Sequence, residues 1–104
     1  MSRTAGERLA RALVAPIAAF DCIASVETDS RRWASVTFTG EQHSLAIRLS
    51  GPDAGAAADA LLDGIEEREF ALPGHIVISI AAAGRAQTDS AIGVELEALT
   101  IEAD

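Results

Sequence analysis

The side chains that could carry out chemistry are few, and the most reactive are one cysteine and two histidines. Cys22 with His43 or His75 would form a thiolate–imidazole pair, in which the imidazole activates the sulfur as a nucleophile. The three residues stand far apart in the sequence, and no motif of a cysteine enzyme surrounds Cys22. We therefore expect Cys22 to be a buried, unreactive thiol on the apolar side of a strand.

The two histidines are also candidates for metal binding, together with nearby carboxylates. Neither stands in a short ligand motif such as His-x-x-x-His or Cys-x-x-Cys. His43 and His75 both follow turns at the start of predicted strands, where a histidine ordinarily caps the turn or faces water. We expect no metal site and no bound cofactor.

Two glutamates form the remaining candidate for catalysis. Glu95 and Glu97 lie two residues apart in a predicted strand, which puts their carboxylates on one face about 7 Å apart. Such a pair would suit acid–base chemistry. A solvated strand face, opposite Arg48 or Arg85, explains the same pattern, and we favour it. With no catalytic residue assigned, we expect a protein that is not an enzyme.

The cluster Arg31-Arg32-Trp33 is the one that could hold an anion. A guanidinium can bind phosphate through two parallel hydrogen bonds, and an indole ring can stack on a flat part of a ligand. The same residue types are enriched at protein interfaces, and we favour an interface. The formal net charge is −8. Because such a chain repels phosphate backbones, we expect no binding of nucleic acid.

The charge is unevenly distributed along the chain. Residues 1–48 hold six arginines against five acidic residues, a net charge of +1, whereas residues 49–104 hold two arginines against eleven, a net charge of −9. This asymmetry is compatible with head-to-tail contacts between a mildly basic surface of one copy and an acidic surface of another.

Length and composition indicate one folded domain over residues 1–104. Aromatic residues make up 4% of the chain, so the core must consist of Ala, Leu, Ile and Val. A single cysteine excludes an intrachain disulfide and favours a cytoplasmic location, and no apolar run is long enough to span a membrane. All basic residues are Arg and Ala is abundant, which suggests a bacterial, GC-rich genome.

Two helices are predicted. Thr4 and Glu7 have the spacing of a capping box, so the first helix should begin at Thr4 and end or kink near Val14, because Pro16 cannot donate to the carbonyl of Ala12. The second helix follows Gly51-Pro52-Asp53, and Gly64 either ends it early or is tolerated at a cost of about 1 kcal/mol relative to Ala. Its buried stripe is predicted to consist of Ala54, Ala58, Leu61, Leu62 and Ile65.

Five strands are predicted: residues 21–27, 33–39, 44–49, 75–83 and 92–102, with turns at Thr28-Asp29-Ser30, Gly40-Glu41-Gln42 and Leu72-Pro73-Gly74-His75. Strand 75–83 is apolar on both faces, which is typical of a central strand or of one whose second face meets a partner chain. In strand 92–102 the apolar parity changes after Ala98, to Leu99 and Ile101. That change predicts a β-bulge or a sharp twist near residues 97–99.

The predicted architecture is α+β: a five-stranded, mostly antiparallel sheet with two helices on one face, in the order α-β-β-β-α-β-β. Because both helices suit the same face, we expect a second copy of the chain to cover the other face of strand 75–83. The predicted interface consists of Arg31, Arg32, Trp33, Val77, Ser79 and Ala81.

From Thr39 onward the chain resembles the tail-completion, or tail-terminator, proteins of tailed phages and gene-transfer agents. The residues that carry the resemblance are Gly40-Glu41-Gln42-His43, the Ala-rich helix to Leu62-Asp63-Gly64, Leu72-Pro73-Gly74-His75 and the closing Ala98-Leu99-Thr100. They cover about sixty residues, and none of these motifs is chemically specific. The resemblance implies a non-catalytic protein that assembles into a ring.

The sequence does not determine a function. Our first hypothesis is a non-catalytic interaction or structural protein that forms homo-oligomers, with another protein as a further partner and with no membrane partner. The alternatives are a phage-like tail-completion ring protein and an α+β module that binds a small ligand in a pocket between helices and sheet.

Overall fold

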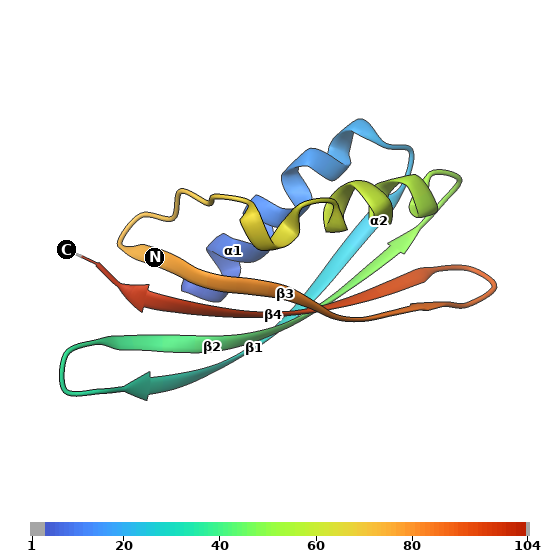
Figure 1. Ribbon diagram of the computed structural model, residues 1–104. Helices are drawn as coiled ribbons and strands as arrows, with labels where there is room; N and C mark the ends of the chain where they lie inside the picture. Colours follow the sequence, from blue (N-terminus) through green and yellow to red (C-terminus); the bar gives the residue numbers. More distant parts are fainter. Residues whose placement is uncertain (1–3, 104) are drawn as a thin grey trace.

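The computed structural model describes residues 4–103 and shows an α+β fold with a layer of helices on one face of an antiparallel sheet (Figure 1). The helices are α1 (Ala5–Val14) and α2 (Ala54–Leu62), extended by the short 3₁₀ helices η1 (Ala15–Ala19) and η2 (Ile65–Glu67). The strands are β1 (Ile23–Ala34), β2 (Thr39–Ser50), β3 (His75–Gln87) and β4 (Ile92–Glu102). No helix in residues 4–103 is long and apolar enough to cross a membrane.

Both helices begin and end for the reasons that the sequence supplies. The Thr4 hydroxyl accepts a hydrogen bond from the Glu7 amide at 3.1 Å, which confirms the predicted cap. The α-helix ends at Val14, and Pro16 stands in the first turn of η1. After Leu62 the chain reverses at Gly64, whose φ of 63° is the left-handed conformation that favours glycine.

The sheet has four strands in the order β1-β2-β4-β3, so the prediction of five strands was wrong. Strand β1 runs without a break from the first predicted strand through Thr28-Asp29-Ser30 to Ala34, so the turn predicted there is absent and the second predicted strand, 33–39, does not form. The chain reverses later, at residues 35–38, where the Ser35 amide donates to the carbonyl of Phe38 at 2.7 Å. The element order is therefore α-β-β-α-β-β.

Strand β3 lies at an edge of the sheet, which overturns the first of the two alternatives for strand 75–83, a central strand. It pairs with β4 alone, and the central strands are β2 and β4. The bulge predicted in β4 is also wrong, because β4 pairs with β2 in unbroken register from Ile92 to Ile101. The irregularities lie in β3, between Val77 and Ser79 and between Ala82 and Gly84.

The core fills the space between the helices and the inner face of the sheet. Its fully buried residues include Leu9 and Leu13 of α1, Ala57 and Ala58 of α2, and the alternating inward residues Leu45, Ile47, Leu49, Val94 and Leu96. The alanines of α2 bring its backbone close to the sheet, which suits a chain with few aromatic side chains. The opposite face of the sheet, called the open face below, is not covered by any helix of the described chain (Figure 1).

Candidate functional site

The histidine at the centre of the inner face is buried, not solvated as the sequence suggested. His43 is completely excluded from solvent. Its Nδ1 lies 2.7 Å from the Ser30 hydroxyl and its Nε2 lies 2.9 Å from the Thr100 hydroxyl. A neutral imidazole has one donor and one acceptor, and the two hydroxyls can complement both. The three side chains therefore link β1, β2 and β4 by hydrogen bonds.

Burial of the ring decides its protonation state. Desolvation lowers the pKa of His43 below its usual value of 6.5; the nearby Glu41 carboxylate opposes this shift, and His75 adds to it. A serine hydroxyl beside a neutral imidazole resembles an activated nucleophile. Helix α1 covers that hydroxyl, however, since a Cβ at Gly6 would lie only 2.8 Å from Ser30 Oγ. No carboxylate orients the ring, whose second nitrogen contacts Thr100. We interpret the cluster as structural.

The proposed thiolate–imidazole pair with His43 is not formed. Cys22 precedes β1, whereas His43 pairs with Ser30 near the other end of that strand. Eight residues of strand separate the two positions, or about 26 Å. Cys22 is half-buried against the core. His75 lies at the start of β3, where its Nδ1 is 3.2 Å from the carbonyl oxygen of Pro73.

The two glutamates lie on the open face, as predicted, and both are exposed. Across the sheet Glu95 pairs with Ala46 and Glu97 with Ser44, so neither carboxylate stands opposite Arg48 or Arg85. Arg85 instead donates to Asp59 of α2 at 2.8 Å. The expectation of a solvated strand face fits the structure, but the expected arginine partners do not.

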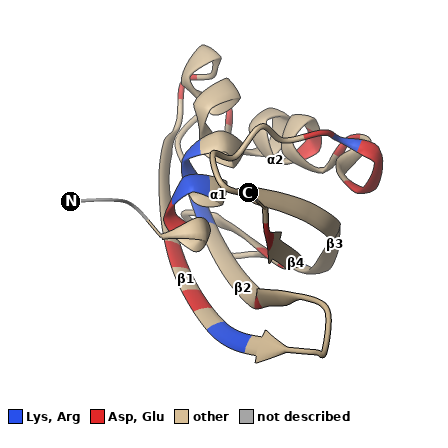
Figure 2. Cartoon of the chain, turned by 90° about the vertical axis from the view of Figure 1, so that its left-hand side faces the viewer, with Lys and Arg blue, Asp and Glu red and all other residues tan. Residues whose placement is uncertain are grey.

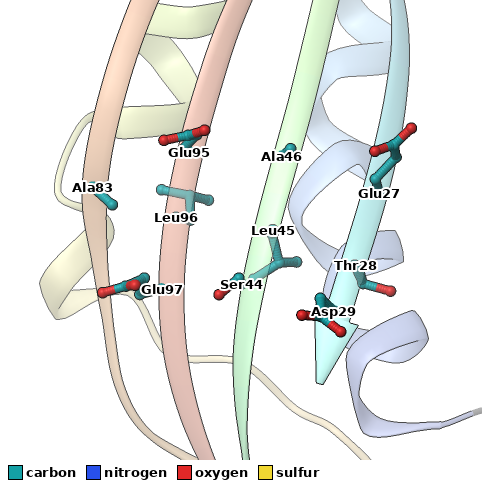
Figure 3. A pocket seen from close by; sticks show the side chains of 10 residues that line it. All are labelled: Glu27, Thr28, Asp29, Ser44, Leu45, Ala46, Ala83, Glu95, Leu96 and Glu97. Carbon is teal, nitrogen blue, oxygen red and sulfur yellow. The ribbon is translucent and has the colours of Figure 1, made fainter. Parts of the chain in front are cut away.

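Glu27 and Asp29 of β1 extend this acidic area across the sheet (Figure 3). The four carboxylates border a shallow hollow of about 340 Å³ over Ser44 and Ala46 of β2. The hollow is open to solvent along the sheet. No group of three or more histidines, cysteines or acids within residues 4–103 is arranged to hold a metal ion.

The predicted interface residues divide between the two faces of the sheet. Strand register places Trp33 in one row with Gly40, Ile101 and Ile76, and Arg31 in the next row with Gln42, Leu99 and Ser79, all on the open face. Ala81 follows on the same face, opposite Glu97. Arg32 and Val77 belong to the inner-face register, where the exposed Arg32 approaches Glu102 at 3.9 Å and Val77 packs against the core.

Trp33 packs closely against the neighbouring strand. A Cβ at Gly40 would lie 2.9 Å from the ring atom Cζ2, and it would also collide with the Thr100 carbonyl oxygen. The close contact explains why glycine occupies position 40. The indole Nε1 is buried and has no hydrogen-bond partner among the described residues. Trp33 is therefore half-buried although it lies on the open face.

A group of apolar residues lies on the open face at the end where β3 begins, opposite the end that carries the exposed Ile23. Ile76 and the bulge residue Ile78 are 50% and 51% exposed, and Leu99 and Ile101 are half-buried beside them. With Trp33, these four residues form what we call the apolar corner. The sequence identified Trp33 and strand 75–83, but the parity change to Leu99 and Ile101 was interpreted as a β-bulge or twist, whereas β4 pairs with β2 in unbroken register and both residues lie on the open face.

Two further features were missed. The turn between β1 and β2 exposes Val36 completely and Phe38 by 51%. An apolar groove of about 400 Å³ lies in the helix layer, between α1–η1 and the end of α2 with the segment that follows it. The sequence contained one signal for the turn, Ser35 next to Val36, but the alternation of apolar and polar residues favoured a strand. The groove depends on how helices pack, which no local pattern reveals.

Comparison with protein-family models gives no match, and comparison with curated proteins gives none either. The resemblance to phage tail-completion proteins therefore stays a prediction.

Proposed function

We propose that this protein is a non-catalytic interaction protein that self-associates through the apolar corner. The observation that carries the proposal is the exposure of Ile76 and Ile78 beside Leu99 and Ile101, on a face that no helix of the described chain covers. Contiguous exposed apolar side chains at one place mark interaction sites more often than scattered ones do.

The edge position of β3 supports the same proposal. From Ile76 to Gly84 the strand has no charged residue and no proline, which are the usual devices that keep an edge from pairing. Its two bulges leave Ser79–Ala82 regular. A partner can therefore pair with only a short stretch of backbone, and the isoleucine side chains must supply most of the contact.

A second copy is the partner that suits this surface best. A two-fold contact places the apolar corner against itself, since the same patch serves both subunits. The corner lies at one end of the open face, and the carboxylates of Glu95 and Glu97 lie farther along it. Two chains of net charge −8 can then meet without bringing those carboxylates together.

The test is the mass of the protein in solution as a function of concentration. We expect the wild type to be larger than one chain, and Ile76→Ser with Ile78→Ser to shift the assembly toward smaller species. The matched control is Ile23→Ser, because Ile23 is 74% exposed on β1 but lies outside the corner. A wild type that stays a monomer at every concentration contradicts the proposal, as does an equal effect of the control.

A further inference from the structure

A second surface for contact between copies is suggested by the turn that joins β1 to β2, called here the hairpin tip (residues 35–38). The hairpin extends away from the helix layer, and its tip lies at an end of the molecule (Figures 1 and 2). Val36 is fully exposed and Phe38 is 51% exposed. The tip is ordered by the Ser35 hydroxyl, which accepts hydrogen bonds from the amides of Thr37 and Phe38 at 3.4 and 3.0 Å.

A receptor of matching chemistry is present elsewhere on the same chain. The helix-layer groove, of about 400 Å³, is lined mainly by apolar side chains of α1, η1, the end of α2 and the segment around Phe70; among them are Leu13, Pro16, Ile17, Phe20 and Leu61. Its volume lies within the range of pockets that enclose small apolar groups, about 300–1,000 Å³. A valine and a phenylalanine at a tight turn are groups of that kind.

The charges around the two features are complementary. Arg31 and Arg32 are exposed on β1 just before the hairpin tip, where they form the basic band near the end of β1 (Figure 2). Glu66, Glu67 and Glu69 are exposed beside the groove, in the acidic segment that follows α2. Arg68 in the same segment is occupied, since its Nη2 donates to the carbonyl oxygens of Ala60, Leu61 and Asp63.

A chain cannot close this contact upon itself in the described fold. The hairpin tip points away from the helix layer, and the groove lies within that layer (Figures 1 and 2). We infer that the hairpin tip of one copy inserts into the helix-layer groove of another, with Arg31 and Arg32 against the acidic segment 66–69. Such a contact is heterologous, so each copy retains one unused tip or groove, and assembly continues into a ring or an open filament.

The inference rests on the proposed self-association but uses a different surface from the apolar corner. The sharpest test mixes two defective variants, both made in a chain that also carries Ile76→Ser and Ile78→Ser. One variant loses the tip through Val36→Ser and Phe38→Ser. The other blocks the groove through Ala60→Arg and Ala71→Arg, at exposed positions where an added side chain spares the core and repels Arg31.

We expect each variant alone to have the mass of one chain, and the mixture to form a complex of two chains, because one intact tip then meets one intact groove. An isologous contact gives no such rescue. Arg31→Glu and Arg32→Glu, added to the variant with the intact tip, should abolish the complex. Glu66→Arg and Glu67→Arg, added to the variant with the intact groove, should then restore it.

A mixture that remains monomeric overturns the inference. The inference is also overturned if Val36→Ser with Phe38→Ser, made without the corner substitutions, leaves the mass of the assembly equal to that of the wild type. In that case the proposed self-association through the apolar corner still stands. Binding of a small apolar dye to the groove equally in the wild type and in the tip variant also counts against the inference, because an inserted tip excludes the dye. A monomeric wild type refutes both proposals.

Discussion

Nε2 of His43 lies 2.9 Å from Oγ1 of Thr100, and both side chains are completely buried. The contact joins the two central strands, β2 and β4, across the inner face of the sheet. It places a polar pair among leucines and isoleucines, where each partner depends on the other for its hydrogen bond.

The first prediction concerns this pair. Thr100→Val keeps the shape of the side chain but leaves a buried ring nitrogen without a partner, which costs about 1–3 kcal/mol of the free energy of unfolding. Urea denaturation measures the loss. Thr37→Val is the control, because Thr37 is exposed in the hairpin tip and should change stability by less than about 0.5 kcal/mol. Equal stabilities of the two variants would contradict the structural role of the pair.

The second prediction concerns pH. Burial holds the pKa of His43 below the value of 6.5 that applies in the unfolded chain. Below pH 6.5 His43 is therefore protonated to a greater extent in the unfolded state than in the folded state. The free energy of unfolding then falls as pH decreases from 6.5 through the folded-state pKa. We expect a lower urea midpoint at pH 5.5 than at pH 7.5. The ¹³C shifts of the His43 ring should show it less than half-protonated at pH 6.5, and a half-protonated ring at that pH refutes the prediction.

The third prediction compares two glycines. Gly40→Ala forces a Cβ against the Thr100 carbonyl oxygen and the Trp33 ring, so we expect a loss of at least about 1–3 kcal/mol. Gly55→Ala adds a methyl group in helix α2, where the nearest atom of another element is Ile92 Cδ1 at 3.9 Å. Because alanine is the better helix former, this variant should gain about 0.5–1 kcal/mol. Thermal unfolding of both variants checks the opposite signs.

The fourth prediction concerns the junction before β1. The Asp53 carboxylate accepts a hydrogen bond from the Asp21 amide at 2.8 Å, and the Asp53 amide donates to the Asp21 carbonyl oxygen at 3.1 Å. Asp53→Ala removes the first of these bonds, and we expect a loss of about 0.5–1.5 kcal/mol in urea denaturation. Asp63→Ala is the matched control, because no side-chain bond of Asp63 holds two segments together. A loss as large in the control would contradict this role.

Local signals predicted the helices well because their ends depend on neighbouring residues. Each helix end is determined by residues within one or two turns of it: Thr4 with Glu7, Pro16 and Gly64. The same local reasoning failed at Thr28-Asp29-Ser30, whose residues favour turns. In the fold they belong to an edge strand, where polar side chains reach solvent. The Ser30 hydroxyl forms a hydrogen bond with His43 of the neighbouring strand.

The order of strands was not predictable from the pattern of β3. A central strand and an edge strand with an apolar interaction surface have the same two-sided hydrophobicity, and the choice depends on pairings between distant segments. The residues of the apolar corner were predicted only in part, because their grouping also depends on pairings between distant segments. Trp33 and Ser79 do share the open face, but Leu99 and Ile101 join them only because β4 continues without a bulge.

The strand order β1-β2-β4-β3 also shapes how the chain folds. Each outer strand pairs only with its neighbour in sequence, across a short turn, so two hairpins can form from local contacts. The seam between them joins residues separated by 43 positions at Leu49–Ile92 and by 61 at Gly40–Ile101. Closing such loops is slow, because the entropy cost precedes the gain from contacts. We therefore expect Val94→Ala, at the seam, and Val26→Ala, within a hairpin that forms before the seam closes, both to slow refolding in stopped-flow experiments.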